Sequence, residues 1–106
     1  IYETYTQGGA GIMGETIFDA LTTARTHGPD LVLPMITSFG AGIMHNTHGL
    51  FGPEPTTLGH SGWGGSMAIA DQRHGLTCAY VMNKQSNILV GDPRAVRLVE
   101  AVYDCL

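Results

Sequence analysis

The sequence predicts an α/β fold of the α+β type, in which a segment of antiparallel sheet is flanked by helices. Apolar residues recur at helical spacing within residues 15–25 and 93–105. Short apolar runs bounded by glycine and polar residues lie between them, within residues 37–44, 60–70 and 76–83. A short polar connection joins the last two runs, and such a connection is typical of an antiparallel hairpin.

The first helical segment is predicted to form a short amphipathic helix over residues 15–25. Ile17, Leu21 and Ala24 recur there at the spacing of one helix face. The helix is expected to end near residues 27–30, because glycine suits the residue after a helix and proline cannot continue the hydrogen-bond ladder. A surface loop is expected to follow.

A strand is predicted over residues 37–44, after Pro34. The turn-rich residues 45–55 are expected to form an irregular excursion of the kind that often lines pockets. Strands over residues 60–70 and 76–83 follow as antiparallel neighbours. Alternate apolar residues of the first strand are expected to share one face: Phe39, Ala41 and Ile43.

The helix predicted over residues 93–105 has clear chemical signals at its start. Asp92 suits the N-cap because its carboxylate can accept a backbone N–H of the first turn. Pro93 suits the first helical position, where its missing N–H costs nothing. The apolar stripe of this helix is expected to dock on the sheet, and it consists of Val96, Val99, Val102 and Tyr103.

Size and charge exclude several classes of protein. The chain has 106 residues, 43% of them hydrophobic, which suffices for one domain with a modest core over residues 1–106. The net charge is −4, and the five Lys and Arg residues are spread singly. This pattern lacks the basic footprint of a nucleic-acid binder and makes acidic membranes poor partners. No apolar run approaches the roughly 20 residues that cross a bilayer.

The sequence does not mark a compartment. Residues 1–5 lack the basic and apolar regions of a signal peptide. Cys78 and Cys105 form neither a metal-type pair nor a disulfide framework, and we expect both to be buried free thiols. Because the sequence does not begin with Met, we expect a piece of a longer polypeptide.

The segment from Leu58 to Ser66 is the strongest functional candidate. Four of its residues, at positions 59, 62, 64 and 65, are glycine, although glycine is costly inside a strand. This pattern indicates either a tight bend or a ligand that approaches the main chain. His60 and Ser61 are adjacent and would point to opposite faces of a strand, so they cannot form a catalytic pair with each other. One of them is expected to face a cleft and to donate a hydrogen bond or a proton to a substrate.

Other residues carry weaker signals. Trp63 either stacks on a ligand or fills the space that its glycine neighbours leave, and we favour the ligand. Asn83 and Lys84 end a predicted strand, where their side chains either face the cleft edge or are simply solvated. The spacing of His45 and His48 would suit a small zinc site, but no cysteine lies near them.

Residues 59–66 read G-H-S-G-W-G-G-S and resemble the glycine-rich strand of class C β-lactamase-related esterases, which are serine hydrolases. Residues 38–42, S-F-G-A-G, are similar to the R-W/F-G-L-G segment common in these esterases, and residues 51–55, F-G-P-E-P, to their F-G-P-x-P segment. The resemblance extends from about Gly11 onward. It implies the C-terminal part of a β-lactamase/transpeptidase-like fold. The implied activity is the hydrolysis of esters, with β-lactams and amides as less favoured substrates. The resemblance implies neither a cofactor nor a metal.

The resemblance also implies roles for individual residues. His60, Ser61 and Gly62 stand where the family has Lys, Thr and Gly. The backbone N–H of Trp63 would then complete the oxyanion hole. Replacing Lys by His removes a permanent cation, which favours neutral ester substrates over β-lactams. The implied catalytic residues are His60, Ser61 and Trp63, and the implied substrate-binding residues are Gly62, Gly64 and Asn83.

The chain departs from the family in one respect. The nucleophilic S-x-x-K motif and the Y-x-N motif are absent, since no serine of the chain has Lys three positions later. We therefore expect the nucleophile to lie in the remainder of a parent polypeptide, and this chain alone to be inactive. The expected partners are that remainder and a small ester, with a homo-oligomer possible in addition. The alternatives are a non-catalytic binding or structural member of the same fold and, more weakly, a metal-binding module that uses His45 and His48.

Overall fold

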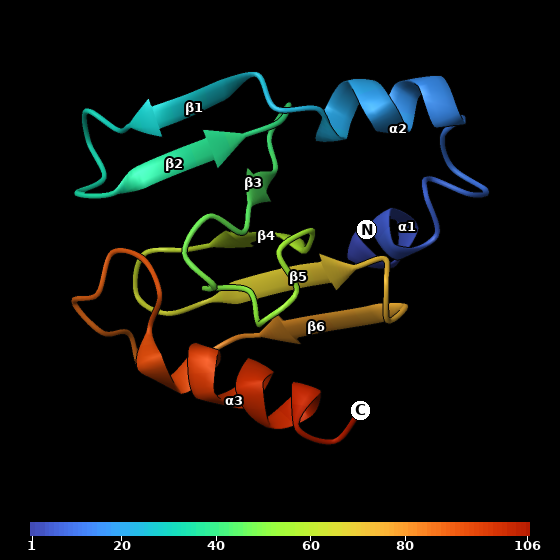
Figure 1. Cartoon of the computed structure of the whole chain (residues 1–106). Helices are drawn as coiled ribbons and strands as arrows, with labels where there is room; N and C mark the ends of the chain where they lie inside the picture. The colour runs from blue at the N-terminus through green and yellow to red at the C-terminus, as the bar shows by residue number, and fades with distance from the viewer.

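A six-stranded antiparallel sheet forms the centre of the molecule. The computed structural model describes residues 1–106, and each strand pairs with the next one along the chain, in the order β1-β2-β3-β4-β5-β6 (Figure 1). The predicted antiparallel sheet with flanking helices is thus confirmed. The elements in chain order are α1 (Tyr2–Thr6), α2 (Glu15–Thr22), β1 (Thr26–Pro29), β2 (Ile36–Phe39), β3 (Met44–His45), β4 (Leu58–Ser61), β5 (Met67–Asp71), β6 (Leu76–Tyr80) and α3 (Pro93–Tyr103).

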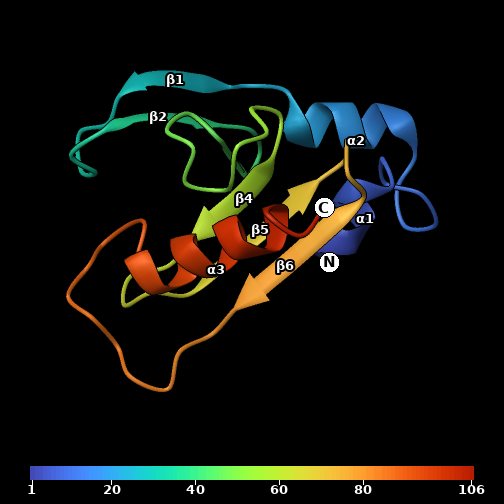
Figure 2. The same ribbon diagram turned by 60° about the horizontal axis from the view of Figure 1, so that its bottom comes forward.

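Helices lie on both faces of the central strands. Figure 2 shows α3 in front of β4, β5 and β6, with α1 behind them. The alternation of side chains along β5 divides its residues between the two faces. Met67 and Ile69 point to the α3 face and are buried in the core, whereas Ala68 and Ala70 point to the opposite face.

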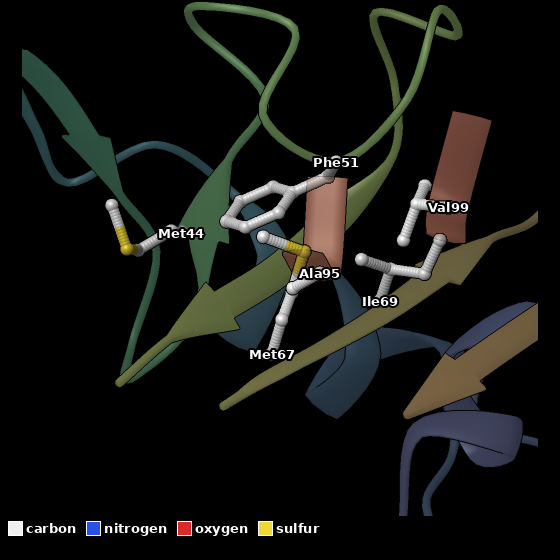
Figure 3. Packing of buried hydrophobic residues seen from close by; sticks show 6 residues of the cluster. All are labelled: Met44, Phe51, Met67, Ile69, Ala95 and Val99. Atoms are coloured by element: carbon white, nitrogen blue, oxygen red, sulfur yellow. The ribbon is translucent and has the colours of Figure 1, made fainter. Parts of the chain in front are cut away.

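The core lies between α3 and the sheet. Its members come from β3, β5, α3 and the loop before β4, and they are Met44, Phe51, Met67, Ile69, Ala95 and Val99 (Figure 3). Val99 belongs to it, and Val96 and Tyr103 pack against it as predicted, whereas Val102, the remaining residue of the predicted stripe, is only partly buried and is not part of it. Ala95 lies one turn before Val99 on the same face, so it completes the contact.

The start of α3 is as predicted. Asp92 is the N-cap and accepts a hydrogen bond from the Arg94 N–H at 2.9 Å, and Pro93 occupies the first turn. The helix ends at Tyr103, two residues before the predicted end, and Cys105 is exposed. Cys78 is partly buried in β6, so the prediction of two buried thiols is wrong, although both are free.

The first helix and the segment after it differ from the prediction. Helix α2 ends at Thr22, and Thr23 is already extended, with φ −60° and ψ 134°. Two consecutive threonines, 22 and 23, are β-branched and disfavour helix. Residues 26–29 are the edge strand β1 rather than a helix end and a loop, and Pro29 pairs with Ile36. An edge strand tolerates proline because one side of it needs no hydrogen-bond donor.

Two predicted strands are each divided by a turn. Residues 37–44 contain β2, a bend and β3, because Gly42 adopts a φ of +84° and the Gly40 N–H donates to the Ile43 carbonyl. The bend buries Ile43 and exposes Ala41, so these two do not share one face. Residues 60–70 likewise contain the last two residues of β4, a turn and most of β5. None of the helices is long and apolar enough to span a membrane.

Candidate functional site

A tight turn of residues 62–65, here called the glycine turn, joins β4 to β5. The Gly65 N–H donates to the Gly62 carbonyl at 3.1 Å, and the Gly62 N–H donates to the Ser66 carbonyl at 2.8 Å. Gly64 has a φ of +97°, the left-handed conformation that a type II turn places on glycine. The glycines therefore form the bend that the sequence predicted, while the approach of a ligand to this backbone stays a prediction.

The turn leaves the backbone N–H of Trp63 without a partner. No hydrogen bond within the chain uses this N–H as a donor. The carbonyl of the same peptide group, that of Gly62, accepts from the Gly65 N–H inside the turn. Because the N–H and C=O of a trans peptide point in opposite directions, the Trp63 N–H is directed out of the turn. It is thus oriented to donate to an acceptor outside the turn.

His60 and Ser61 occupy opposite faces of β4. The Ser61 hydroxyl is on the α3 face, where it is buried and accepts a hydrogen bond from the Gly91 N–H at 3.2 Å. His60 is exposed on the other face, opposite Ala68 of β5. The structure therefore places the His60 side chain, and not the Ser61 hydroxyl, where a substrate could meet it.

The tautomer of His60 follows from its one hydrogen bond. Its Nδ1 lies 3.0 Å from the Ser61 carbonyl oxygen, which can only accept, so Nδ1 carries the proton in this contact. In the neutral ring Nε2 is then the acceptor, and no partner within the chain occupies it. The Phe39 ring centroid lies 6.3 Å from that of His60.

The remaining predicted site residues lie at the same end of the sheet. Ser61 pairs with Met67, and Met67 pairs with Tyr80. The last residues of β4 and of β6 therefore lie at the same end of the sheet, on either side of the start of β5. Asn83 follows this end of β6 and is exposed. A hollow of about 390 Å³ opens beside the exposed Trp63 indole, and it is lined by Trp63, Gly64, Gln85, Ser86 and Asn87.

Sequence reasoning missed the amide side chains of this hollow. Gln85 and Asn87 lie in the same loop as Asn83 and Lys84. The prediction at Asn83 and Lys84 therefore indicated the right loop but did not include Gln85 and Asn87. Nothing lining the hollow carries a charge. Such a surface suits a neutral, partly planar group, since an indole face and amides can contact it without desolvating an ion.

Asp92 lies directly beneath the glycine turn. Its carboxylate is buried and accepts hydrogen bonds from Arg94 and from the Ser86 hydroxyl. The Arg94 guanidinium, followed by the Ser86 hydroxyl, holds the pKa of Asp92 well below its usual range. The carboxylate is therefore charged at neutral pH.

The two histidines of the suggested metal site are engaged elsewhere. His45 contacts the Ser38 hydroxyl through Nδ1 at 2.8 Å and the Thr22 carbonyl through Nε2 at 2.7 Å. His48 contacts the Ile36 carbonyl through Nε2 at 2.8 Å. No group of three or more potential ligands is assembled anywhere in residues 1–106.

Comparison with known proteins identifies the family. Residues 4–102 match the family model described as Beta-lactamase, so the chain belongs to the β-lactamase family. A solved penicillin-binding protein homolog from Caulobacter crescentus is 46% identical, with a TM-score of 0.92 over 99% of this chain. A solved family VIII carboxylesterase is 36% identical, with a TM-score of 0.91 over 100% of this chain. A search of curated protein sequences found no match.

These comparisons confirm the resemblance to β-lactamase-related proteins that residues 59–66 indicated. The chain spans 30% of the length of each of the two solved chains, so it corresponds to one part of a β-lactamase/transpeptidase-like fold. The family match and the similarity to a carboxylesterase place the chain among β-lactamase-like proteins, a family that includes serine hydrolases.

Proposed function

We propose that this chain forms the oxyanion-side wall of the active site of an ester-cleaving serine hydrolase. The nucleophilic serine would lie outside residues 1–106, in an S-x-x-K motif of the parent polypeptide that also carries a Y-x-N motif. One observation carries the proposal: the Trp63 N–H has no partner and points out of a rigid turn. Membership of the β-lactamase family and the similarity to a carboxylesterase support it.

The proposed reaction is acyl transfer in two steps. The external serine hydroxyl would attack the ester carbonyl carbon while a base of the parent polypeptide takes its proton, and the carbonyl π electrons would move to oxygen to give a tetrahedral oxyanion. The Trp63 N–H and the N–H of the nucleophile would stabilise this oxyanion. Its electrons would then re-form the carbonyl as the C–O bond to the alcohol breaks, and the alcohol would leave with the proton held by the base. Water then hydrolyses the acyl-enzyme and regenerates the serine. His60 would orient the substrate from the exposed face of β4.

Three of the four serines of this chain are engaged or inaccessible, and the fourth, Ser66, has Ile69 and not Lys three positions later. The Ser61 hydroxyl accepts a hydrogen bond from the Gly91 N–H, and the Ser86 hydroxyl donates one to the Asp92 carboxylate. Ser38 contacts an imidazole, that of His45, as a nucleophile contacts its base. However, Ser38 is only 5% exposed and lines none of the hollows of the chain, so a substrate carbonyl has no access to it.

The test compares two substitutions of Trp63 in the polypeptide that carries this chain. Proline suits the second position of a type II turn and lacks an N–H, so Trp63→Pro removes the proposed donor with little change to the turn. Trp63→Ala removes the indole but keeps the N–H. We expect Trp63→Pro to lower kcat for a p-nitrophenyl ester by about 100-fold or more relative to Trp63→Ala.

Labelling with a fluorophosphonate locates the nucleophile independently. We expect one labelled serine, outside residues 1–106, after digestion and mass spectrometry. A label on a serine of this chain would contradict the location of the nucleophile. If no serine is labelled and no ester is hydrolysed, the chain belongs to a non-catalytic member of the fold that binds a partner or assembles into oligomers.

A further inference from the structure

The glycine turn is held from behind by three side chains that the proposed chemistry does not use: Ser86, Asp92 and Arg94, here called the Asp92 cluster. We propose that the Asp92 cluster is a positioning unit that fixes the direction of the Trp63 N–H. This inference rests on the proposed function, because the direction of that N–H matters for catalysis only if it meets the oxyanion.

The carboxylate of Asp92 is fixed by four donors. Its Oδ1 accepts from the Arg94 backbone N–H at 2.9 Å and from Arg94 Nε at 3.0 Å. Its Oδ2 accepts from Arg94 Nη2 at 2.9 Å and from the Ser86 hydroxyl at 2.6 Å. Asp92 is 2% exposed and also caps α3, so the helix start and the carboxylate hold a single arrangement.

The cluster reaches the turn through Gly64. The Gly64 carbonyl accepts from Arg94 Nη2 at 3.3 Å and from the Ser86 backbone N–H at 3.0 Å. The Gly64 N–H donates to the Ile88 carbonyl at 3.1 Å. A second guanidinium nitrogen, Arg94 Nη1, donates to the Lys84 carbonyl at 2.8 Å and ties in the same loop. Both backbone polar groups of Gly64 are therefore held from outside the turn.

The two peptide groups that flank Trp63 are each held by one hydrogen bond. The peptide group before Trp63 is fixed within the turn by the hydrogen bond from Gly65 to Gly62. The peptide group after Trp63 is fixed from the loop by the hydrogen bond from Gly64 to Ile88. The Asp92 cluster holds the next peptide group, between Gly64 and Gly65, through the Gly64 carbonyl, and it therefore acts on the direction of the Trp63 N–H through Gly64.

The Asp92 cluster also packs closely against Gly65. A Cβ added at Gly65 would lie 2.7 Å from Asp92 Oδ2 and 2.9 Å from Arg94 Nη2, which is closer than real Cβ contacts. The ion pair thus lies directly against the backbone of the turn. Arginine suits this position because its planar fork bonds a carboxylate through two nitrogens and still reaches the carbonyls of Gly64 and Lys84.

The test uses the polypeptide that carries this chain, with Arg94→Gln as the main variant and Arg97→Gln as the control. Arg97 lies on the same helix, is exposed, and bonds only to the Pro93 carbonyl. Arg94→Gln is expected to lower kcat for p-nitrophenyl acetate by about tenfold to 100-fold while KM changes little. It should weaken binding of a phosphonate that mimics the oxyanion by a similar factor, and Arg97→Gln should change neither.

A spectroscopic measurement separates this inference from the proposed function. In ¹⁵N–¹H spectra, Arg94→Gln should shift the amide signals of Trp63 and Gly64, whereas Arg97→Gln should leave them in place. If the signals do not shift in Arg94→Gln, the inference is wrong whatever the hydrolysis shows. If the wild type hydrolyses the ester and Arg94→Gln keeps its kcat, the inference is also wrong while the proposed function stands. If the wild type hydrolyses no ester, the proposed function fails, and positioning for catalysis fails with it.

Discussion

The two turns that flank β5 differ in how their backbone N–H groups are held. The glycine turn precedes β5, and the turn of residues 72–75 follows it. The 72–75 turn is linked to α3 through Asp71, which bonds Tyr103 near the end of the helix, whereas the glycine turn is bonded by Arg94, the partner of Asp92 at the start of the helix. The Asp71 carboxylate accepts from two backbone N–H groups of its turn, those of Arg73 and His74, whereas Asp92 accepts from none in the glycine turn, where the Trp63 N–H is free. The first arrangement stabilises the fold, and the second leaves a group available for a ligand.

Asp71 connects the hairpin of β5 and β6 to α3. Its carboxylate accepts from the backbone N–H groups of Arg73 and His74, from His74 Nδ1 at 2.7 Å and from the Tyr103 hydroxyl at 2.6 Å. Burial, together with the hydrogen bond to Asp71, raises the pKa of Tyr103 to about 12. The phenol therefore stays protonated and remains a donor at physiological pH.

The largest effect on stability is expected from Asp71→Ala. The substitution removes an acceptor that is fully buried and leaves the Tyr103 hydroxyl and two backbone N–H groups without it. We expect the free energy of unfolding to fall by about 3 kcal/mol in urea titration. Asp19→Ala is the matched control, because Asp19 is exposed and should change stability by no more than about 0.5 kcal/mol. Equal effects of the two would show that Asp71 does not link the hairpin to α3.

A smaller loss is expected when the glycine turn is altered by Gly65→Ala. Gly65 has a φ of +120°, and its new Cβ would meet Asp92 and Arg94. We expect a loss of about 2 kcal/mol on unfolding, together with a fall in ester hydrolysis. Gly14→Ala serves as the comparison, since nothing lies within 4 Å of its Cβ and its φ is −78°. It should cost less than about 1 kcal/mol and leave hydrolysis unchanged.

Local chemistry explains which parts of this comparison could be predicted from the sequence. The N-cap at Asp92, the helix start at Pro93 and the bend at the glycines depend on residues next to each other, and all three occur as predicted. Strand β1 was missed because its Gly28-Pro29 pair reads as a helix end. Only pairing with β2, ten residues further on, makes it a strand.

The decisive features of the site depend on contacts between distant residues. Arg94 and Gly64 are 30 positions apart, and Ser61 and Gly91 are also 30 apart. No pattern in the sequence indicates that these groups meet. The sequence identified Trp63 through its glycine neighbours, but the free N–H follows from the backbone hydrogen bonds around it. Glycine neighbours alone indicate a ligand at the indole, and the role of the N–H is implied only by the family resemblance, while nothing in the sequence indicates the Asp92 cluster.

The two faces of β4 can be separated by single substitutions. Ser61→Ala leaves the Gly91 N–H without its acceptor, and we expect it to lower the free energy of unfolding by about 1 kcal/mol. His60→Ala removes an exposed ring and should change stability by less than about 0.5 kcal/mol. We expect the reverse order for ester hydrolysis, with kcat/KM falling about tenfold or more in His60→Ala only. A larger loss of hydrolysis in Ser61→Ala would place the substrate on the α3 face instead.

The smallest expected effect is a pH dependence carried by Asp71. Burial alone would raise the pKa of this carboxyl, but hydrogen bonds from Tyr103 and His74 outweigh burial, so the pKa lies below its ordinary value of 3.8. A lowered pKa in the folded state means that the folded protein binds the proton less readily than the unfolded chain does. The contribution of Asp71 to stability is therefore fully present above the ordinary value and is lost as the pH falls through the lower, folded-state pKa.

Comparison with Asp71→Asn isolates this contribution, since Asp92 and Glu54 also have lowered pKa values and lose stabilising charge in acid. Wild type and Asp71→Asn should differ in the free energy of unfolding at about pH 6, and the difference should shrink as the pH approaches about 3. Because burial opposes the hydrogen bonds of Asp71, this change should be smaller than the loss in Asp71→Ala. A difference that stays constant with pH would mean that the carboxylate charge is not what holds this turn to α3.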